Sequence, residues 1–141
     1  MEDNTIKELN IVADSVNLDE VAAFVEEFLE SHDCSMELMV TIAIAVEEVF
    51  VNIAHYAYGT EGGGKATVRL EFDEDKRQAR FIFIDSGEAF DPLAKPDPDL
   101  DAYHKERRVG GLGILMVKKS MDDVVYERKD DKNILTLIKT I

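Results

Sequence analysis

Glu48 and Asn52 form the first pair of side chains in the sequence that is suited to binding or catalysis. They lie four residues apart in an apolar segment, so on a helix their β-carbons would be neighbours, about 6 Å apart. A carboxylate can accept a proton or orient a hydroxyl group, and an amide oxygen is a hard donor that suits Mg²⁺. The pair either converges on one ligand or forms part of a solvated polar face, and an isolated pair favours the polar face.

A second candidate site lies where an apolar segment ends in Asp85-Ser86-Gly87. Ligands often meet a sheet at the end of a strand. There, Asp85 could accept a hydrogen bond from an exocyclic amine, and Gly87 would let a flat ring approach the backbone. An ordinary turn leaving a strand has the same sequence. These residues alone leave the binding site and the turn equally favoured.

A third candidate site is the segment Gly110-Gly111-Leu112-Gly113, which precedes an apolar helix-like run. Glycines at the start of a helix expose amide N–H groups, and the positive end of the helix dipole adds to their attraction for phosphate. Arg107 and Arg108 stand just before them. A flexible loop end with a solvated basic pair is the alternative, and we favour the phosphate interpretation.

Three other motifs are similar to known ligand sites but lack essential residues. The segment from Gly59 to Lys65 is similar to a phosphate-binding loop, yet Ala66 replaces the Ser or Thr that would bind Mg²⁺. The alternating aspartates at 97–101 begin like a calcium loop and lack its later Gly and Glu. His32 and Cys34 lack two further ligands at zinc spacing. We therefore predict a connecting loop and no calcium or zinc site.

The apolar spacing in the first half of the chain predicts the elements that position the first pair. Thr5 to Val12 is predicted to be a strand, and Leu18 to Ser31 an amphipathic helix that begins with a capping pair of Asn17 and Glu20. A longer helix is expected to start after Ser35, to carry the candidate glutamate and asparagine, and to end near Gly59.

The second half of the chain is predicted to contain two hairpins, a long loop and a short helix. We expect these elements at Thr67–Phe72, Ala79–Ile84, Ser86–Arg108, Gly113–Met121, Val124–Arg128 and Ile134–Ile141. A loop of this length inside a compact domain is usually functional or disordered. The order of elements predicts an α+β two-layer sandwich, with a mixed, mostly antiparallel sheet and helices on one face.

Length and charge limit the function classes that the chain can belong to. Its 141 residues predict one domain, over residues 1–141. The formal net charge of −14 argues against nucleic acid or an anionic membrane as a partner, because either would be repelled over most of the surface. A polyanionic ligand would need a strictly local site, and a basic protein partner would be favoured.

Cysteine content and hydropathy predict a cytoplasmic protein. The single cysteine, Cys34, excludes an internal disulfide and fits a reducing compartment. The longest apolar run, from Leu38 to Val46, is shorter than the roughly 20 residues of a membrane helix. The first residues lack the basic start and apolar stretch of a secretory signal.

Three motifs taken together resemble the GHKL superfamily of Bergerat-fold ATPases and kinases. They are Glu48-Val49-Phe50-Val51-Asn52, the segment from Asp85 to Asp91, and Gly110-Gly111-Leu112-Gly113-Ile114, in the order and spacing of that superfamily. With these, the segment from Asn52 to Gly59 and Phe90-Asp91-Pro92 are most similar to the stand-alone anti-sigma-factor serine kinases. The resemblance covers nearly the whole chain and implies the Bergerat ATP-binding fold.

The resemblance implies a role for each candidate residue that would lie near the phosphates. Asn52 would coordinate Mg²⁺, Glu48 would act as the base on the acceptor hydroxyl, and His55 would lie near the phosphates. Gly110, Gly111 and Gly113 would form the phosphate-binding turn. Arg107 or Arg108 would stabilise charge on the transferred phosphoryl group.

The resemblance also implies how the adenine end of the nucleotide would be held. Asp85 would bind the adenine amino group, and Gly87 would make room for the ring. Thr136, in the last strand, would lie near the adenine. Ser86 to Arg108 would form a mobile lid over the nucleotide.

The implied activity is phosphorylation by Mg-ATP of a Ser or Thr on a STAS-type anti-sigma-factor antagonist, in a partner-switching system. A sigma factor would be a further partner, and the resemblance implies a homodimer. Two alternatives remain open at this point. The domain could be a non-catalytic nucleotide-binding module that sequesters a sigma factor or another regulator, or a scaffold that binds no nucleotide.

Overall fold

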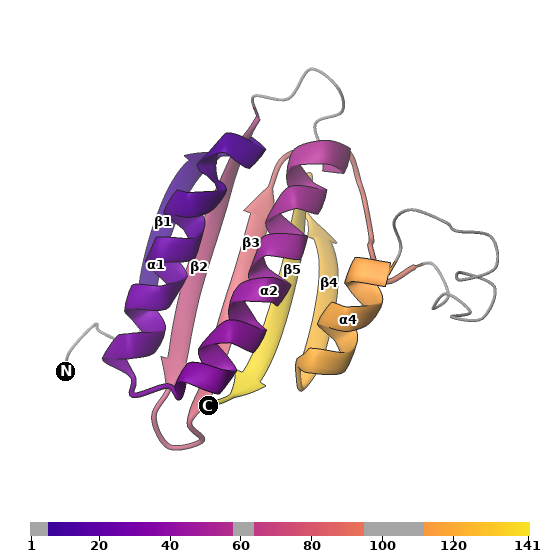
Figure 1. The fold of residues 1–141 in the computed structure, drawn as a ribbon. Coiled ribbons are helices and arrows are strands. Elements are labelled where there is room, and N and C mark those ends of the chain that lie inside the picture. The colour runs from indigo at the N-terminus through magenta and orange to yellow at the C-terminus, as the bar shows by residue number, and fades with distance from the viewer. Residues whose placement is uncertain (1–5, 58–63, 95–111) are drawn as a thin grey trace, which may run out of the picture.

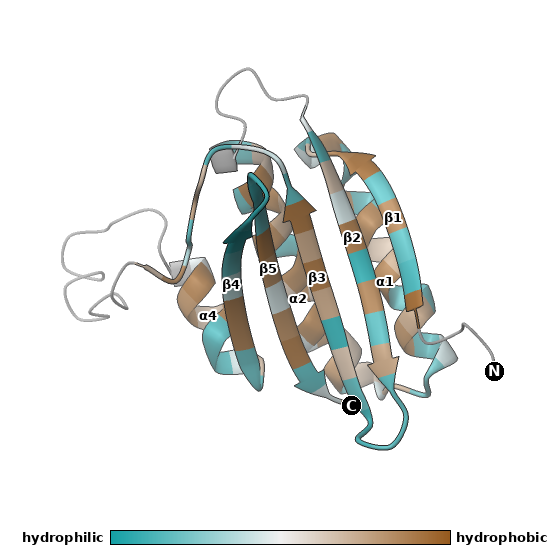
Figure 2. Ribbon diagram, turned by 180° about the vertical axis from the view of Figure 1, so that it is seen from behind, coloured by the Kyte–Doolittle hydropathy of each residue, from teal (hydrophilic) through white to brown (hydrophobic). Residues whose placement is uncertain are grey.

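A single sheet covered on one face by helices makes up the computed structural model, which describes residues 6–57, 64–94 and 112–141 (Figure 1). Hydrophilic and hydrophobic residues alternate along β2 when the sheet is seen from its other, uncovered face (Figure 2). The elements are β1 (Ile6–Val12), η2 (Ser15–Asn17), α1 (Leu18–Ser31), α2 (Met36–Asn52), η3 (Ile53–Ala57), β2 (Lys65–Asp73), β3 (Gln78–Asp85), α4 (Leu112–Ser120), β4 (Asp123–Lys129) and β5 (Lys132–Thr140).

The sheet has five strands in the order β1-β2-β3-β5-β4. All four neighbouring pairs are antiparallel, so the parallel pair of a mixed sheet does not occur among the described residues. The α+β class and the two-layer architecture predicted from the sequence are confirmed. The register places Asp85, the last residue of β3, directly opposite Asn133 of β5.

The core lies between the sheet and the helices because each strand alternates its side chains between the two faces. Along β2 and β3 the buried positions recur every second residue. The largest fully buried side chains of the sheet are Leu70, Phe81, Phe83 and Leu137, and they face Ile42, Val46, Val49 and Phe50 of α2. The apolar stripe predicted for α2 is the side of the helix that packs on the sheet.

The start of α1 differs from the predicted capping pair. Asn17 caps no amide, and its Nδ2 donates to the carbonyl of Val12 at 3.0 Å. Asp14 accepts instead from the amide of Val16 at 3.0 Å and begins the 3₁₀ turn η2. Because η2 runs directly into α1, Asn17 has φ −94° and ψ 6° rather than the extended backbone of a side-chain N-cap.

The start of α2 is as predicted, and its last turn has a different helix type. Ser35 is the N-cap, and its hydroxyl accepts from the amide of Leu38 at 3.2 Å. The α-helix ends at Asn52 and continues as the π-helical turn η3 to Ala57, and the predicted end near Gly59 lies outside the described residues. Apolar spacing does not distinguish an α turn from a π turn, and π turns occur frequently at functional sites.

By length and composition alone, one helical stretch of the described residues could cross a membrane. It runs from Met36 to His55 with a mean hydropathy of 1.7. The uninterrupted apolar run ends at Val46, while the helix extends past the two carboxylates at 47–48. Its apolar side packs against the sheet, where Ile42 and Phe50 have no exposed surface.

Candidate functional site

A small pocket lies where the end of β3 meets the end of α2 and the start of α4. Its walls are mostly apolar and include Val49, Ile53, Phe83, Ile114 and Leu135. Its polar groups are Asn52, Asp85, Tyr126 and Asn133. Folding therefore brings Asn52 and Asp85, which lie in separate sequence motifs, to one apolar pocket with few polar groups, which is the usual composition of a ligand site.

Asp85 is the buried acid of this pocket, with 4% of its surface exposed. Its Oδ1 accepts from the amide of Gly87 at 2.9 Å and from Nδ2 of Asn133 at 2.9 Å. No described residue donates to its Oδ2, which is not fully enclosed. One carboxylate oxygen is thus held by the protein, and the other remains able to accept a hydrogen bond from a ligand.

Asn133 is a residue of the site that the sequence analysis missed. Its Nδ2 donates to Asp85 and also to the carbonyl of Glu88 at 2.7 Å, and its Oδ1 accepts from the amide of Phe90 at 3.2 Å and from the hydroxyl of Tyr126. The side chain links the end of β3 to the loop that follows it. Only the β3–β5 register could have identified it, because nothing near Asn133 in the sequence indicates its partner.

Gly87 lies in the tight turn that follows Asp85, which is one of the two interpretations that the sequence left open. It is buried, its amide donates to Asp85, and its carbonyl accepts from Nη1 of Arg128 at 2.8 Å. Arg128, on β4, is a second contact that the sequence did not indicate. The turn is thereby fixed from both sides, by a carboxylate and by a guanidinium.

Glu48 lies against the first turn of α4. It is half-buried on α2, and a β-carbon added at Gly113 would overlap its carboxyl group. Asn52, one turn further along α2, lines the pocket, as does Ile114 of α4. The predicted Glu48 and Gly113 are therefore direct neighbours, and the carboxylate lies at the helix end whose dipole favours negative charge.

Replacing Gly113 by Ala is expected to displace the Glu48 carboxyl group, because the new methyl group overlaps its Cδ and both of its oxygens. The displaced atoms are the flexible end of a side chain, so we expect the cost to cancel much of the gain of up to about 1 kcal/mol that a helical Gly→Ala change normally brings. Urea unfolding measures the free energy of unfolding of each variant. In the E48A background the same change meets no overlap and should stabilise more than in the unchanged protein, whereas equal effects of G113A in both backgrounds would contradict the contact.

Two residues predicted to lie near the nucleotide are not part of the pocket wall. Thr136 pairs with Ile82 and points to the uncovered face of the sheet, because Asn133, Leu135 and Leu137 are the alternate residues of β5 that are buried. Its position near the adenine stays a prediction from the family resemblance. His55 is exposed in η3 and is not part of the pocket wall.

Four predicted site residues lie outside the described residues: Arg107, Arg108, Gly110 and Gly111. The same holds for most of the predicted loop from Ser86 to Arg108, of which the structure describes the part up to Ala94. Phe90 belongs to the described part, and it lies in the pocket wall beside Asp85.

His32 and Cys34 follow the end of α1 and are not part of the pocket wall. His32 is buried between the rings of Phe28 and Phe72, at 4.7 and 4.1 Å, and its carbonyl accepts from Arg77 at 2.7 Å. Burial raises the pKa of the Cys34 thiol, and nearby Arg77 lowers that pKa by a smaller amount. Within residues 6–57, 64–94 and 112–141, no three His, Cys, Asp or Glu side chains are placed to hold a metal ion.

Comparison with known proteins gives consistent results. The family model of the histidine kinase-like ATPase domain matches residues 11–139. The serine/threonine-protein kinase BtrW of Bordetella bronchiseptica is 28% identical over 103 residues, which are 73% of this chain and 71% of BtrW. The serine-protein kinase RsbW of Listeria innocua is 33% identical over 95 residues, which are 64% of this chain and 59% of RsbW.

Two solved structures share the fold at low sequence identity. The SiaB-SiaC complex of Pseudomonas aeruginosa matches with a TM-score of 0.68 and 20% identity, over 98% of this chain and 90% of the matched chain. The RsbU and RsbW domains of Rv1364c from Mycobacterium tuberculosis match with a TM-score of 0.62 and 18% identity, over 94% of this chain and 32% of that one. Together with the family match, they confirm the resemblance to the GHKL superfamily. This chain, with its buried Asp85 at the end of β3 and Asn52 at the end of α2, belongs to the family of histidine kinase-like ATPase domains.

Proposed function

We propose that the chain binds Mg-ATP in the pocket between β3, α2 and α4 and is a protein serine/threonine kinase of the anti-sigma-factor type. Its substrate would be a STAS-type antagonist protein in a partner-switching system. The observation that carries the proposal is the convergence of Asp85, Asn52 and the start of α4 beside Glu48, from three distant parts of the sequence. The names of the curated relatives support protein kinase activity.

Adenine would be recognised by Asp85. Its free Oδ2 accepts a hydrogen bond from the exocyclic amino group, and apolar walls that include Val49 and Leu135 enclose the ring. A hydrogen bond to a charged acceptor contributes about 1.5–3 kcal/mol. Asn133 holds the other oxygen of Asp85 and so orients the carboxylate before the nucleotide binds.

The triphosphate would extend from the adenine toward the start of α4. Amide N–H groups at a helix start and the positive end of its dipole bind phosphate, and Gly113 belongs to that turn. Asn52 would hold Mg²⁺ through its amide oxygen, and the ion would neutralise phosphate charge. Gly110, Gly111, Arg107, Arg108 and His55 remain part of this proposal through the family resemblance.

Glu48 would accept the proton of the acceptor hydroxyl during transfer. The hydroxyl oxygen forms a bond to the γ-phosphorus as the bond from that phosphorus to the bridging oxygen of ADP breaks. The carboxylate is half-buried and lies on the same helix face as Asn52, one turn away. A base at this position is close to the phosphates without contacting the adenine.

The partners of the chain are proposals as well. The matched segment spans 71% of BtrW and only 59% of the Listeria RsbW. One of the solved structures that share the fold is the SiaB-SiaC complex, and a matched chain in a protein complex supports a protein partner for this chain. We further propose one domain over residues 1–141, a homodimer, a sigma factor as second partner and a cytoplasmic location.

Phosphotransfer from labelled Mg-ATP tests the proposal. The full chain is incubated with a STAS-domain protein from the same genome, and phosphoamino-acid analysis should find phosphoserine or phosphothreonine on that protein. Nucleotide binding without transfer to any STAS-domain protein would support the non-catalytic module instead. A melting temperature unchanged by Mg-ATP would support the scaffold that binds no nucleotide.

A further inference from the structure

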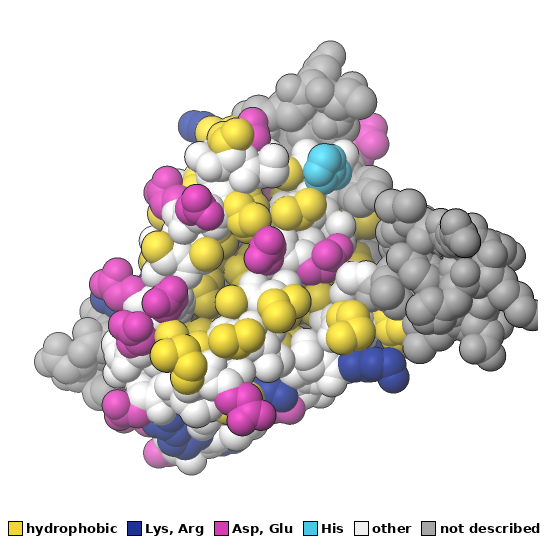
Figure 3. Space-filling model, in the orientation of Figure 1, with side chains coloured by type: hydrophobic (Ala, Val, Ile, Leu, Met, Phe, Trp, Pro, Cys, Tyr) yellow, Lys and Arg dark blue, Asp and Glu magenta, His cyan; other side chains and the backbone are white. Residues whose placement is uncertain are grey.

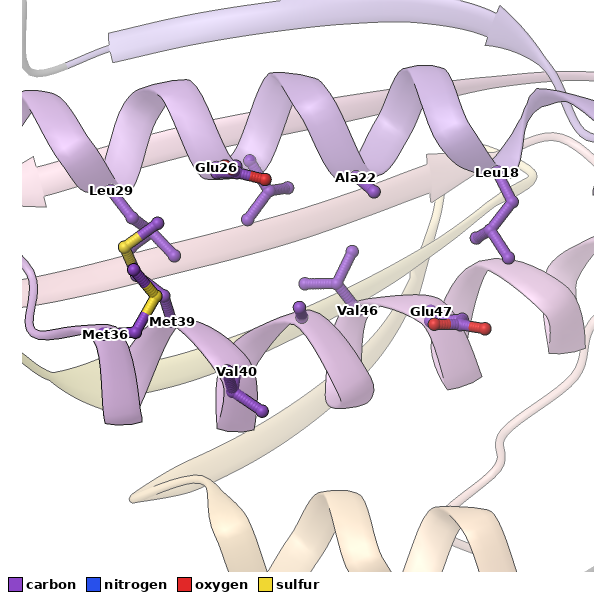
Figure 4. Close-up of a pocket in the computed structure, with 11 residues that line it drawn as sticks. Leu18, Ala22, Glu26, Leu29, Met36, Met39, Val40, Val46 and Glu47 are labelled. Carbon is purple, nitrogen blue, oxygen red and sulfur yellow. The ribbon is translucent and has the colours of Figure 1, made fainter.

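An apolar groove between α1 and α2 lies outside the pocket described above. Its lining includes Leu18, Ala22 and Leu29 of α1 and Met36, Val40 and Val46 of α2, and none of its lining residues belongs to the pocket (Figure 4). The groove encloses about 620 Å³ of space, part of it open to solvent. It lies on the helix layer, on the side of α2 away from α4 (Figure 1).

Several apolar side chains of α2 in and beside the groove are largely exposed to solvent. Met36 is 73% exposed, Val40 54% and Ile44, also on α2, 60%. Large exposed apolar patches on soluble domains usually mark interaction sites. Methionine side chains such as Met36 adapt readily to different apolar partners.

The same two helices carry only negative charge. The sequence has no Lys or Arg between Lys7 and Lys65. The helices carry eight carboxylates: Asp19, Glu20, Glu26, Glu27, Glu30, Glu37, Glu47 and Glu48. Acidic and apolar side chains therefore alternate over this face, and Glu26 and Glu47 line the groove itself (Figures 3 and 4).

We propose that the α1–α2 groove docks an amphipathic, basic helix of a partner protein. From Leu18 to Leu29 the groove follows α1 for about 16 Å, which is three turns of a partner helix. Apolar residues of that helix at spacings of three and four fill the groove, and its Lys and Arg residues face Glu26 and Glu47. This inference concerns a surface that the proposed kinase chemistry does not use.

Other occupants fit the surface less well. A second copy of this chain would bring the same carboxylates against each other, since a two-fold interface pairs a patch with itself. An anionic lipid surface would be repelled by the same charge. A partner strand has no sheet edge to extend here, because both sides of the groove are helices whose backbone groups are already bonded.

A synthetic peptide tests the proposal with the full chain. The probe has about 14 residues, about 21 Å as a helix, with Leu along one face and Lys along the other; a second peptide carries Glu in place of Lys. Fluorescence anisotropy without nucleotide should show binding of the Lys peptide and at least about tenfold weaker binding of the Glu peptide. Higher salt should weaken the binding.

Two matched double variants distinguish binding in the groove from nonspecific attraction by the net negative charge. E26K/E47K reverses two charges in the groove, and E74K/E127K reverses two exposed charges elsewhere. Both change the net charge equally. We expect at least about tenfold loss of peptide affinity in the first variant and less than about twofold in the second. The surface variant M36S/V40S should also lose at least about tenfold through its apolar contacts.

The following results would overturn the inference. Equal losses of peptide affinity in the two charge-reversal variants would show only nonspecific attraction. If the Lys peptide does not bind, the proposed docking site is rejected. A dimer in ultracentrifugation that M36S/V40S dissociates would assign the groove to a second copy, and binding to neutral lipid vesicles abolished by M36S/V40S would assign it to a membrane. All groove variants should retain nucleotide binding, so failure here is distinct from failure of the proposed kinase function.

Discussion

Replacing Glu48 by Gln is expected to abolish phosphotransfer and to leave Mg-ATP affinity within about threefold, because the amide keeps the shape of the carboxylate and cannot accept the proton of the hydroxyl. A positioned general base contributes about 10²–10⁴-fold to a rate. Glu48 is half-buried against Gly113 and is not part of the pocket wall, so we expect it to make no contact with the adenine. Single-turnover transfer and nucleotide titration measure the two quantities separately.

Glu47→Gln is the matched control for this experiment. Glu47 is the preceding residue of the same helix, is exposed, and lines the α1–α2 groove rather than the pocket. The Glu47→Gln substitution removes an identical charge and should leave the rate of phosphotransfer unchanged within about twofold. Undiminished transfer in E48Q would reject the assigned base. Lost nucleotide binding in E48Q, together with a lower free energy of unfolding, would indicate that Glu48 acts by positioning α4.

Asp85→Asn is expected to lower ATP affinity by at least about 100-fold, since a hydrogen bond to a charged group is worth about 1.5–3 kcal/mol and the new amide N–H would also face the adenine amino group. The amide oxygen can still accept from Gly87 and Asn133, so the fold should persist. Inosine triphosphate carries a carbonyl oxygen in place of the amino group. The variant should therefore shift its preference from ATP toward inosine triphosphate, and isothermal titration with both nucleotides measures the shift.

Thr136→Val is the matched control for the adenine site. Thr136 points to the uncovered face of the sheet, on the strand that carries Asn133. ATP affinity should stay within about twofold of the unchanged protein, because no pocket contact is lost. A large loss in T136V, or an unchanged ATP preference in the Asp85 variant, would contradict the placement of adenine at Asp85.

Much of the fold could be predicted because its signals are local. The start of α2 after Ser35, the apolar spacing of that helix and the strands β2 and β3 are each indicated within a few residues of sequence, and these predicted elements are confirmed. The errors came where local signals compete. Asn17 could cap α1 or form a hydrogen bond with the preceding strand. Because Asn17 belongs to the 3₁₀ turn η2, its side chain bonds to Val12 of the strand.

The residue types of the site and the order of its motifs follow from the sequence: Glu48 and Asn52 one helical turn apart, Asp85 at a strand end and Gly113 at a helix start. Which of these groups meet depends on how the strands and helices pack. Asn133 reaches Asp85, and Thr136 does not, because strand register assigns alternate residues to opposite faces of the sheet. Likewise, the carboxyl group of Glu48 meets Gly113 because α2 and α4 pack side by side on one face of the sheet, an arrangement that no local spacing encodes.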